Sequence, residues 1–398
     1  MSLLDLAQQY EIERQTIRTL LDSALGARGA EKEIARRAGL TPIHLSYIRA
    51  DKRMPSVAMA QRLAAALAWT EEQREGFVHH VAQMWRLKSS LARQVQPRAP
   101  GPSDEMVNLV RQAHSDATFA RDSESAQILY RRARTMAELL LTVTDPSQAP
   151  LKFAELTFVA HDALCVLNRN DEALWHAQRA RAIAVQLDPR SFPWDKERVD
   201  FIQVNALRCE AVALHNLHLP RHMQRACEEV EALAGLRRNE NFWRPFLNRD
   251  KIQALTDTPR FSIRAVEDLA RQAFNVCATR GDAVDPLLTL LVSQSLALAY
   301  LQYGNFDKAY RVLTRTYDDL DKIPHIGTLH RVIFFKTFAR YYWLQGARGA
   351  EWRAFAEQAF QLATKAGLQH QRQELEGEFG TALLKPEAPV SAHGGQRF

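Results

Sequence analysis

Apolar residues recur with a helical period through most of the chain, and the breaks between periodic segments are short. Leu6, Tyr10, Ile17 and Leu21 share one face of a helix predicted over residues 4 to 25. Gly39 interrupts the pattern that follows. We therefore expect four shorter helices after the first, over residues 31 to 38, 41 to 50, 56 to 68 and 71 to 88.

Two stretches rich in Pro, Gly and small polar residues divide the chain, at residues 94 to 104 and 385 to 398. The first predicts a linker between a domain of residues 1 to 93 and a larger domain of residues 105 to 384. The second predicts a disordered tail. Ser103 precedes two acidic residues and provides a cap for the first helix of the larger domain.

The composition favours an all-α fold. Hydrophobic residues make up 46% of the 398 residues, and Gly and Pro number only 16 each, so residues that propagate helices outnumber those that break them. No apolar run approaches the ~20 residues of a membrane span, and the first residues do not resemble a signal peptide. The four cysteines are widely spaced, so we expect reduced, mostly buried thiols in a cytoplasmic protein.

Positive charge is concentrated in the N-terminal quarter of the chain. Residues 1 to 98 contain 15 Lys or Arg against 10 Asp or Glu, an excess of five, while the whole chain carries a net charge of +6. Attraction to a polyanion depends on the local density of charge. This quarter is therefore the candidate contact for nucleic acid.

Residues 31 to 67 carry signals for two helices joined by a short turn. Gly39 follows the first helix, where the chain reverses and the left-handed conformation suits a residue without a Cβ atom. Thr41 provides a cap for the second helix, and Pro42 occupies its first position. The residues expected in the shared core are Ile34, Leu45, Ile48, Leu63 and Leu67.

This stretch resembles the lambda-repressor-like, or Xre-type, helix-turn-helix family without a gap. The matching positions are Ile34-Ala35, Gly39-Leu40, Thr41, Leu45-Ser46, Ile48, Lys52-Arg53 and Pro55-Ser56. Two positions depart from the family pattern. Glu31 stands where the family often has a Gln that touches the phosphate backbone, and Arg49 replaces an acidic residue close to the expected DNA surface.

The resemblance implies that the helix from Thr41 lies in the DNA major groove. Ile43, His44 and Tyr47 are then expected to face the bases, with Ile43 near a thymine methyl group. The residues expected near phosphates are Thr41, Ser46, Arg49, Lys52 and Arg53. The alternative is that these residues form an ordinary solvated face of a five-helix domain.

One helix pair in the larger domain resembles a tetratricopeptide repeat. Residues that match its spacing are Leu296, Ala297, Tyr300, Gly304, Phe306 and Ala309. A weaker match covers residues 160 to 180, with Asn168 in place of the turn glycine, and a third begins near Ala339. Because such pairs bury their apolar faces only by stacking, we expect a tetratricopeptide-like α-solenoid with a concave surface that binds peptides or partner helices.

Polar residues on the first helices of these pairs are candidates for that concave surface. The repeat spacing directs Asp162, Gln294, Lys336 and Arg340 toward it. Asn205 is polar in an otherwise apolar helix and has the right chemistry to bind a peptide backbone. The alternative for each residue is an ordinary surface or interhelical position.

The order of a helix-turn-helix domain and a repeat array resembles the RRNPP family of peptide-pheromone receptors. That resemblance implies a homodimer whose array binds a short signalling peptide, which changes the spacing of the two DNA-reading domains. The rival interpretation is a repressor or interaction scaffold whose array only dimerises or recruits a protein, with no peptide ligand.

Motifs for catalysis and for cofactor binding are missing from the sequence, so we expect neither an enzyme nor a cofactor. The sequence suggests one metal cluster, made of Cys209, His215, His218, His222 and Cys227. Its spacing does not match a structural zinc site, and Pro220 interrupts it. We therefore expect no metal there, and histidines that serve helix surfaces and turns.

Overall fold

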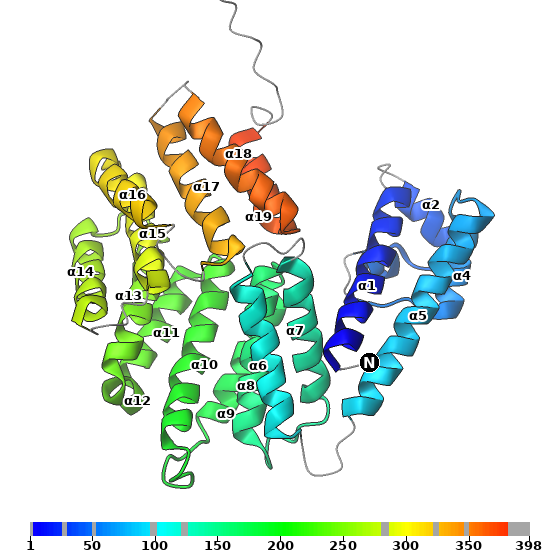
Figure 1. The fold of residues 1–398 in the computed structure, drawn as a ribbon, viewed down its shortest axis with the longest axis horizontal. Helices are drawn as coiled ribbons and strands as arrows, with labels where there is room; N and C mark the ends of the chain where they lie inside the picture. The colour runs from blue at the N-terminus through cyan, green and yellow to red at the C-terminus, as the bar shows by residue number, and fades with distance from the viewer. Residues whose placement is uncertain are drawn as a thin grey trace, which may run out of the picture.

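The structure, a computed structural model, describes residues 3–25, 30–49, 53–95, 102–120, 126–279, 286–320, 326–345 and 350–380. Within these ranges the regular structure is helical throughout, which confirms the all-α prediction (Figure 1). The expected tail, residues 385 to 398, lies outside the described residues.

Five helices form an N-terminal unit beside the rest of the chain (Figure 1). They are α1 (Leu3–Leu25), α2 (Ala30–Arg37), α3 (Pro42–Arg49), α4 (Val57–Ala66) and α5 (Glu71–Val95). Helix α5 runs seven residues beyond its predicted end at residue 88, and so includes the first residues of the expected linker. The buried Leu87 and Leu91 continue its apolar stripe and explain the extension.

The remaining helices form a curved array of antiparallel pairs, in which each first helix also contacts the first helix of the next pair. The paired helices are α6 (Asp104–Thr118) with α7 (Ala126–Leu141), α8 (Pro150–Val166) with α9 (Asn170–Ala184), α10 (Lys196–Asn216) with α11 (Pro220–Ala232), α13 (Glu240–Thr256) with α14 (Ile263–Thr279), α15 (Pro286–Tyr303) with α16 (Phe306–Leu320), and α17 (Thr328–Leu344) with α18 (Ala350–Lys365). The short α12 (Ala234–Arg238) precedes α13, and α19 (Gln369–Phe379) ends the array.

The turns within three of these pairs share one backbone geometry. Asn168, His218 and Gly304 have φ angles of 55°, 56° and 81°. In each turn the next residue donates its N–H to a carbonyl of the preceding helix, as in Asn305 to Tyr300 at 2.8 Å. This left-handed geometry satisfies carbonyls that the helix end leaves free. Asn168 therefore has the backbone conformation of the repeat glycine that it replaces.

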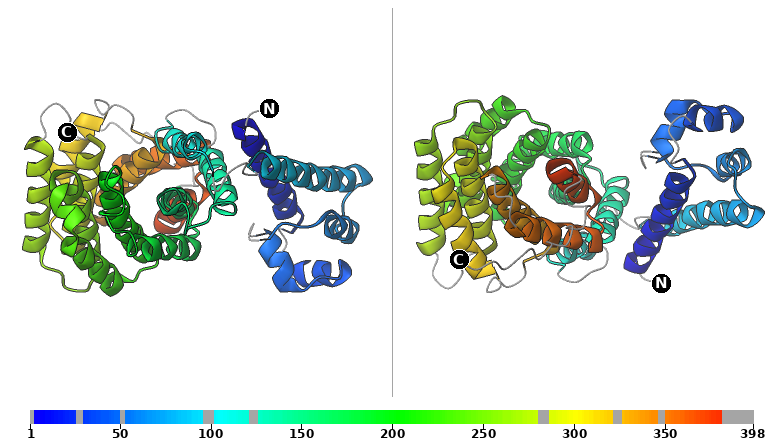
Figure 2. Two further views of the ribbon diagram at one scale, coloured as in Figure 1. Left: turned by 90° about the horizontal axis from the view of Figure 1, so that it is seen from below. Right: turned by 90° about the horizontal axis from the view of Figure 1, so that it is seen from above.

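The array curves until its two ends meet (Figure 2). At the start of α17, Thr328 donates from its backbone N–H and from its Oγ1 to the Ala120 carbonyl that follows α6, at 3.0 and 2.9 Å. Gly327 lies against the backbone here, since a Cβ atom on it would stand 1.9 Å from the Thr118 carbonyl oxygen. Viewed from above or below, α19 lies inside the curve of helices (Figure 2).

Helix α1 joins the N-terminal unit to the array through α7. An apolar core continues across this junction, from Leu6 and Leu91 to Val110 and Met136. Charged and polar side chains surround it, among them the fully buried Glu11, which accepts hydrogen bonds from Arg14 of α1 and Thr135 of α7. Other contacts between α1 and α7 pair Gln15 with Arg131 and Gln8 with Arg132. The position of α1 is therefore coupled to that of α7.

None of the described helices combines the length and the apolar composition that a membrane span requires.

The closure of the array predicts a specific effect of a methyl group at Gly327. The Gly327→Ala variant must displace the α6 backbone, and we expect it to lose about 2 kcal/mol of stability. Gly377→Ala is the matched control, because Gly377 faces open space within α19 and alanine there should add up to about 1 kcal/mol. Urea unfolding of both variants measures the effects. Equal changes in the free energy of unfolding for the two variants would contradict the close approach of Gly327 to the α6 backbone.

Candidate functional site

The surface of α3 is assembled by the predicted turn. Gly39 has a φ of 65°, and Leu40 donates its N–H to the Ala35 carbonyl at 2.8 Å. Thr41 Oγ1 accepts from the N–H of His44 at 3.2 Å and caps α3, which begins at Pro42. The predicted core partners Ile34, Leu45, Ile48, Leu63 and Leu67 are all buried, as expected. One face of α3 is thereby fixed, and the opposite face is left free of helix contacts.

The free face of α3 exposes two large side chains. Ile43 is 63% exposed and Tyr47, one helical turn further on, is 46% exposed. Ser46 is also exposed, and His44 is half-buried beside them. Two large exposed side chains one turn apart on a short helix make this face a candidate contact surface.

Basic side chains border this surface. Arg53 Nη1 donates to His44 Nε2 at 3.0 Å, and the N–H of Arg53 donates to the Tyr47 carbonyl at 3.1 Å. These bonds hold the basic loop against α3. Lys52 lies outside the described residues.

Arg49 has a role that the sequence did not reveal. Its Nε donates to Asp22 of α1 at 2.9 Å, and its Nη1 donates to Glu31 of α2. Glu31 and Arg49 are the two departures from the helix-turn-helix family, and they form an ion pair with each other. The signal that could have predicted this pairing was an acid in place of a neutral residue at Glu31 together with a base in place of an acid at Arg49. Arg49 joins three helices, and two carboxylates balance its charge.

The concave side of the array holds a pocket of about 490 Å³ between α6, α8 and α10. Asp162 and Asn205 both line it, so the structure brings two of the predicted peptide-binding residues together. The other lining residues are Asp104, Asn108, Arg111, His114, Glu155, Phe158, Val159, Arg198 and Phe201. Sequence reasoning missed those of α6, because their place in the pocket depends on the curvature of the array.

The pocket combines an aromatic wall with charged groups that are mostly paired. The rings of Phe158 and Phe201 meet edge to face, with centroids 6.4 Å apart. Arg198 makes two hydrogen bonds to Glu155, at 2.6 and 2.8 Å. The side chains of Asn205 and Asn108 make no hydrogen bond within the described part of the chain. Their carboxamides are therefore available to a ligand that carries peptide groups.

The other three predicted peptide-binding residues are placed differently. Gln294 is only 7% exposed and donates to Thr337 Oγ1 of α17 at 3.4 Å, so its expected place on an open surface is wrong. The packing of α17 against α15 buries it. Lys336 pairs with Glu374 at 2.8 Å, and Arg340 pairs with Glu378. Both partners belong to α19, which covers this part of the inner surface (Figure 2).

The cluster of cysteines and histidines considered from the sequence is not assembled. His215 bonds to Asp257 at 2.6 Å, and His218 occupies the turn after α10. Cys209 instead lies close to His161 of α8. Cys209, Cys227 and Cys277 are buried free thiols, and Cys165 is half-buried, as predicted.

Comparison with protein-family models finds no match for this chain, and comparison with curated proteins finds none either. Function is therefore inferred from the residues and their geometry.

The Arg49 ion pair predicts a measurable coupling between α2 and α3. We expect a double-mutant cycle of Arg49→Gln and Glu31→Gln to give a coupling of about 0.5 to 1 kcal/mol, because both side chains are partly exposed. Salt should weaken this coupling. The exposed pair Arg36 and Glu33, within α2, is the control and should couple less strongly. Zero coupling between Arg49 and Glu31 at low salt would contradict the pairing.

Proposed function

We propose that the chain is a sequence-specific DNA-binding transcriptional regulator, in which α1 to α5 form a helix-turn-helix domain and α6 to α19 form a tetratricopeptide-like solenoid. The outward face of α3 is the observation that carries this proposal. Ile43 and Tyr47 are exposed there beside His44, and Arg53 borders them. Helices that enter the major groove present this mixture of base-contacting and phosphate-contacting groups.

In this proposal Ile43, His44 and Tyr47 contact base edges, and the hydroxyls of Thr41 and Ser46 lie near phosphates with Lys52 and Arg53. Arg49 serves mainly to hold α3 against α1 and α2, since Asp22 and Glu31 already bind its guanidinium group. Two copies of the chain, bound to two half-sites, would form the homodimer that such readers commonly use.

The array is proposed to bind a short peptide in the pocket lined by Asp162 and Asn205. The unpaired carboxamides of Asn108 and Asn205 and the exposed Phe201 support this ligand class, because they suit a peptide backbone and an apolar side chain.

A physical connection from the pocket to α1 supports regulation by such a ligand. His114 lines the pocket, and Asp116 lies two residues later on the same helix. Asp116 Oδ2 is 3.9 Å from Arg132 Nη2 of α7, and Arg132 in turn donates to Gln8 of α1. A ligand that moves α6 therefore acts on the contact that positions the DNA-reading unit.

The α19 contacts favour a second candidate function. Since Lys336 and Arg340 already bind α19, part of the inner surface has an occupant from the chain itself. The array is then an interaction scaffold that dimerises or recruits a protein and takes no peptide.

The DNA-binding proposal predicts the salt dependence of affinity for random-sequence duplex DNA. Replacing Lys52 and Arg53 by Ala should reduce the slope of log affinity against log salt by about 0.9 for each lost phosphate contact. Arg49→Gln should change the slope less, because its charge is already balanced. Arg271→Gln, at an exposed position on α14, is the control and should leave the slope unchanged. An unchanged slope in the Lys52 and Arg53 variants would rule out the proposed interface.

The peptide proposal predicts that a ligand copurifies with the chain from its native host. Mass spectrometry of the denatured protein should detect a short peptide, and the Asn205→Ala variant should lose it. Asn216→Ala changes the same residue type at the end of α10, outside the pocket, and should retain the peptide. Absence of any peptide from the unmodified protein would favour the scaffold function.

A further inference from the structure

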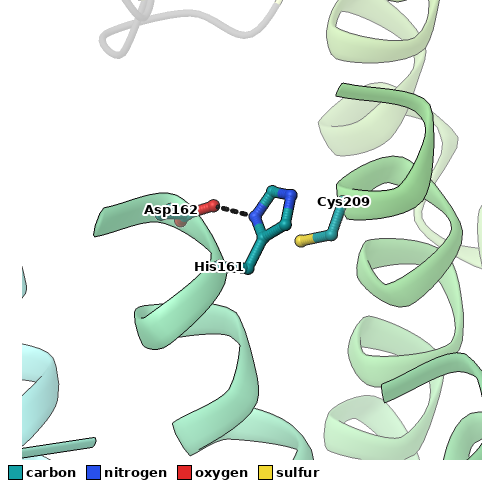
Figure 3. Close-up of side chains that lie close together, drawn as sticks. All are labelled: His161, Asp162 and Cys209. Atoms are coloured by element: carbon teal, nitrogen blue, oxygen red, sulfur yellow. Dashed lines mark hydrogen bonds and ion pairs between the residues drawn. The ribbon is translucent and has the colours of Figure 1, made fainter. Parts of the chain in front are cut away.

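A buried group of metal-binding side chains lies between α8 and α10, beneath the pocket. One donor atom from each of His161, Asp162 and Cys209 lies within 4.8 Å of the other two (Figure 3). His161 is 1% exposed and Cys209 is 4% exposed, whereas the side chain of Asp162 is 45% exposed and lines the pocket. The two buried donors therefore lie behind a carboxylate that opens to solvent.

The chemistry of the three donors is that of a zinc site. Imidazole nitrogen, thiolate sulfur and carboxylate oxygen are the ligands that Zn²⁺ takes from proteins. Donor atoms around a tetrahedral Zn²⁺ are roughly 3.5 Å apart, as its bond lengths of about 2.0 to 2.3 Å require. No two of these donors are more than 4.8 Å apart, so the wider separations close to that spacing with shifts of about 1 Å, whereas His161 Nδ1 and Asp162 Oδ1, now 2.8 Å apart, must separate slightly.

Further side chains support the three donors. His161 Nδ1 and Asp162 Oδ1 are 2.8 Å apart, and the second ring nitrogen, Nε2, lies 3.5 Å from Cys165 Sγ. The second oxygen of Asp162 lies 3.7 Å from His114 Nε2. Cys165 therefore orients His161, and His114 orients Asp162. Metal ligands in proteins are commonly oriented by such neighbouring groups.

Packing alone gives a weaker account of this group. The carboxylate of Asp162 is a strong partner for His161 Nδ1, but the buried Nε2 faces only the sulfur of Cys165, which is a weak hydrogen-bond partner.

We propose that His161, Asp162 and Cys209 bind a thiophilic divalent metal ion of the Zn²⁺ class. The ion replaces the hydrogen bond between His161 and Asp162: it binds Nδ1 of the imidazole with the ring proton held on Nε2, a carboxylate oxygen of Asp162, and the Cys209 thiolate, whose proton passes to solvent on binding. The contact of Nε2 with Cys165 orients the imidazole. The fourth coordination position faces the pocket, on the side where Asp162 is exposed. The ion joins α8 to α10. This metal site does not depend on the proposed binding of peptide or DNA.

Cobalt is the probe that tests this site in the full chain. After removal of metals by a chelator, titration with Co²⁺ should give a thiolate-to-cobalt charge-transfer absorption that saturates at one equivalent, and Zn²⁺ should abolish it. Cys209→Ala should lose this absorption, and Asp162→Asn should bind Co²⁺ at least 10-fold more weakly. Asp162 is partly exposed, so its variant remains informative if Cys209→Ala fails to fold.

Two controls separate this site from other thiols. Cys227→Ala removes an equally buried cysteine on α11 and should leave the absorption unchanged. Cys165→Ala should weaken binding without abolishing the absorption. The proposal is overturned if the unmodified chain shows no charge-transfer absorption, if Cys209→Ala retains it, or if only Cys165→Ala removes it.

Discussion

Each helix pair of this chain carries an apolar stripe that only a neighbouring pair can bury, and this constraint determines the architecture. Short turns such as those at Asn168 and His218 make the two helices of a pair antiparallel neighbours, and successive pairs pack against each other in chain order. The stack curves until Thr328 reaches the end of α6. The first pair has an exposed side as well, and α1 covers it, so the N-terminal unit is attached to the array by the same burial that holds the array together.

This attachment connects the two candidate surfaces of the molecule. The outward face of α3 carries Ile43 and Tyr47, while the pocket lies on the inner side of the first three pairs. Helix α6 lines the pocket and packs against α7, and α7 makes the contact with α1. The contact between α1 and α7 depends on the positions of the groups that donate hydrogen bonds to Glu11. If these donors move away, a buried carboxylate is left without partners and the fold is destabilised. In the proposed regulation, a displacement of α6 would reach α1 through α7.

Local signals in the sequence predicted the parts of the fold that depend on nearby residues. The turn at Gly39, the cap at Thr41 and the buried stripe of α3 follow from spacing and backbone chemistry within a few positions. The features that were missed all join distant segments. Arg49 and Asp22 are 27 positions apart, and the partners of Lys336 and Arg340 come from α19, 38 positions away. The pocket and the His161 group likewise require the curvature of the array, which no local pattern encodes.

Selection of bound duplexes from a random-sequence DNA pool by the full chain tests the central claim most directly. If α3 reads bases, repeated rounds should enrich two related half-sites whose centres are one or more helical turns apart. The same selection with Ile43 and Tyr47 replaced by Ala should lose the preference at specific base positions. A pool that stays random after repeated rounds with the unmodified chain would contradict the account.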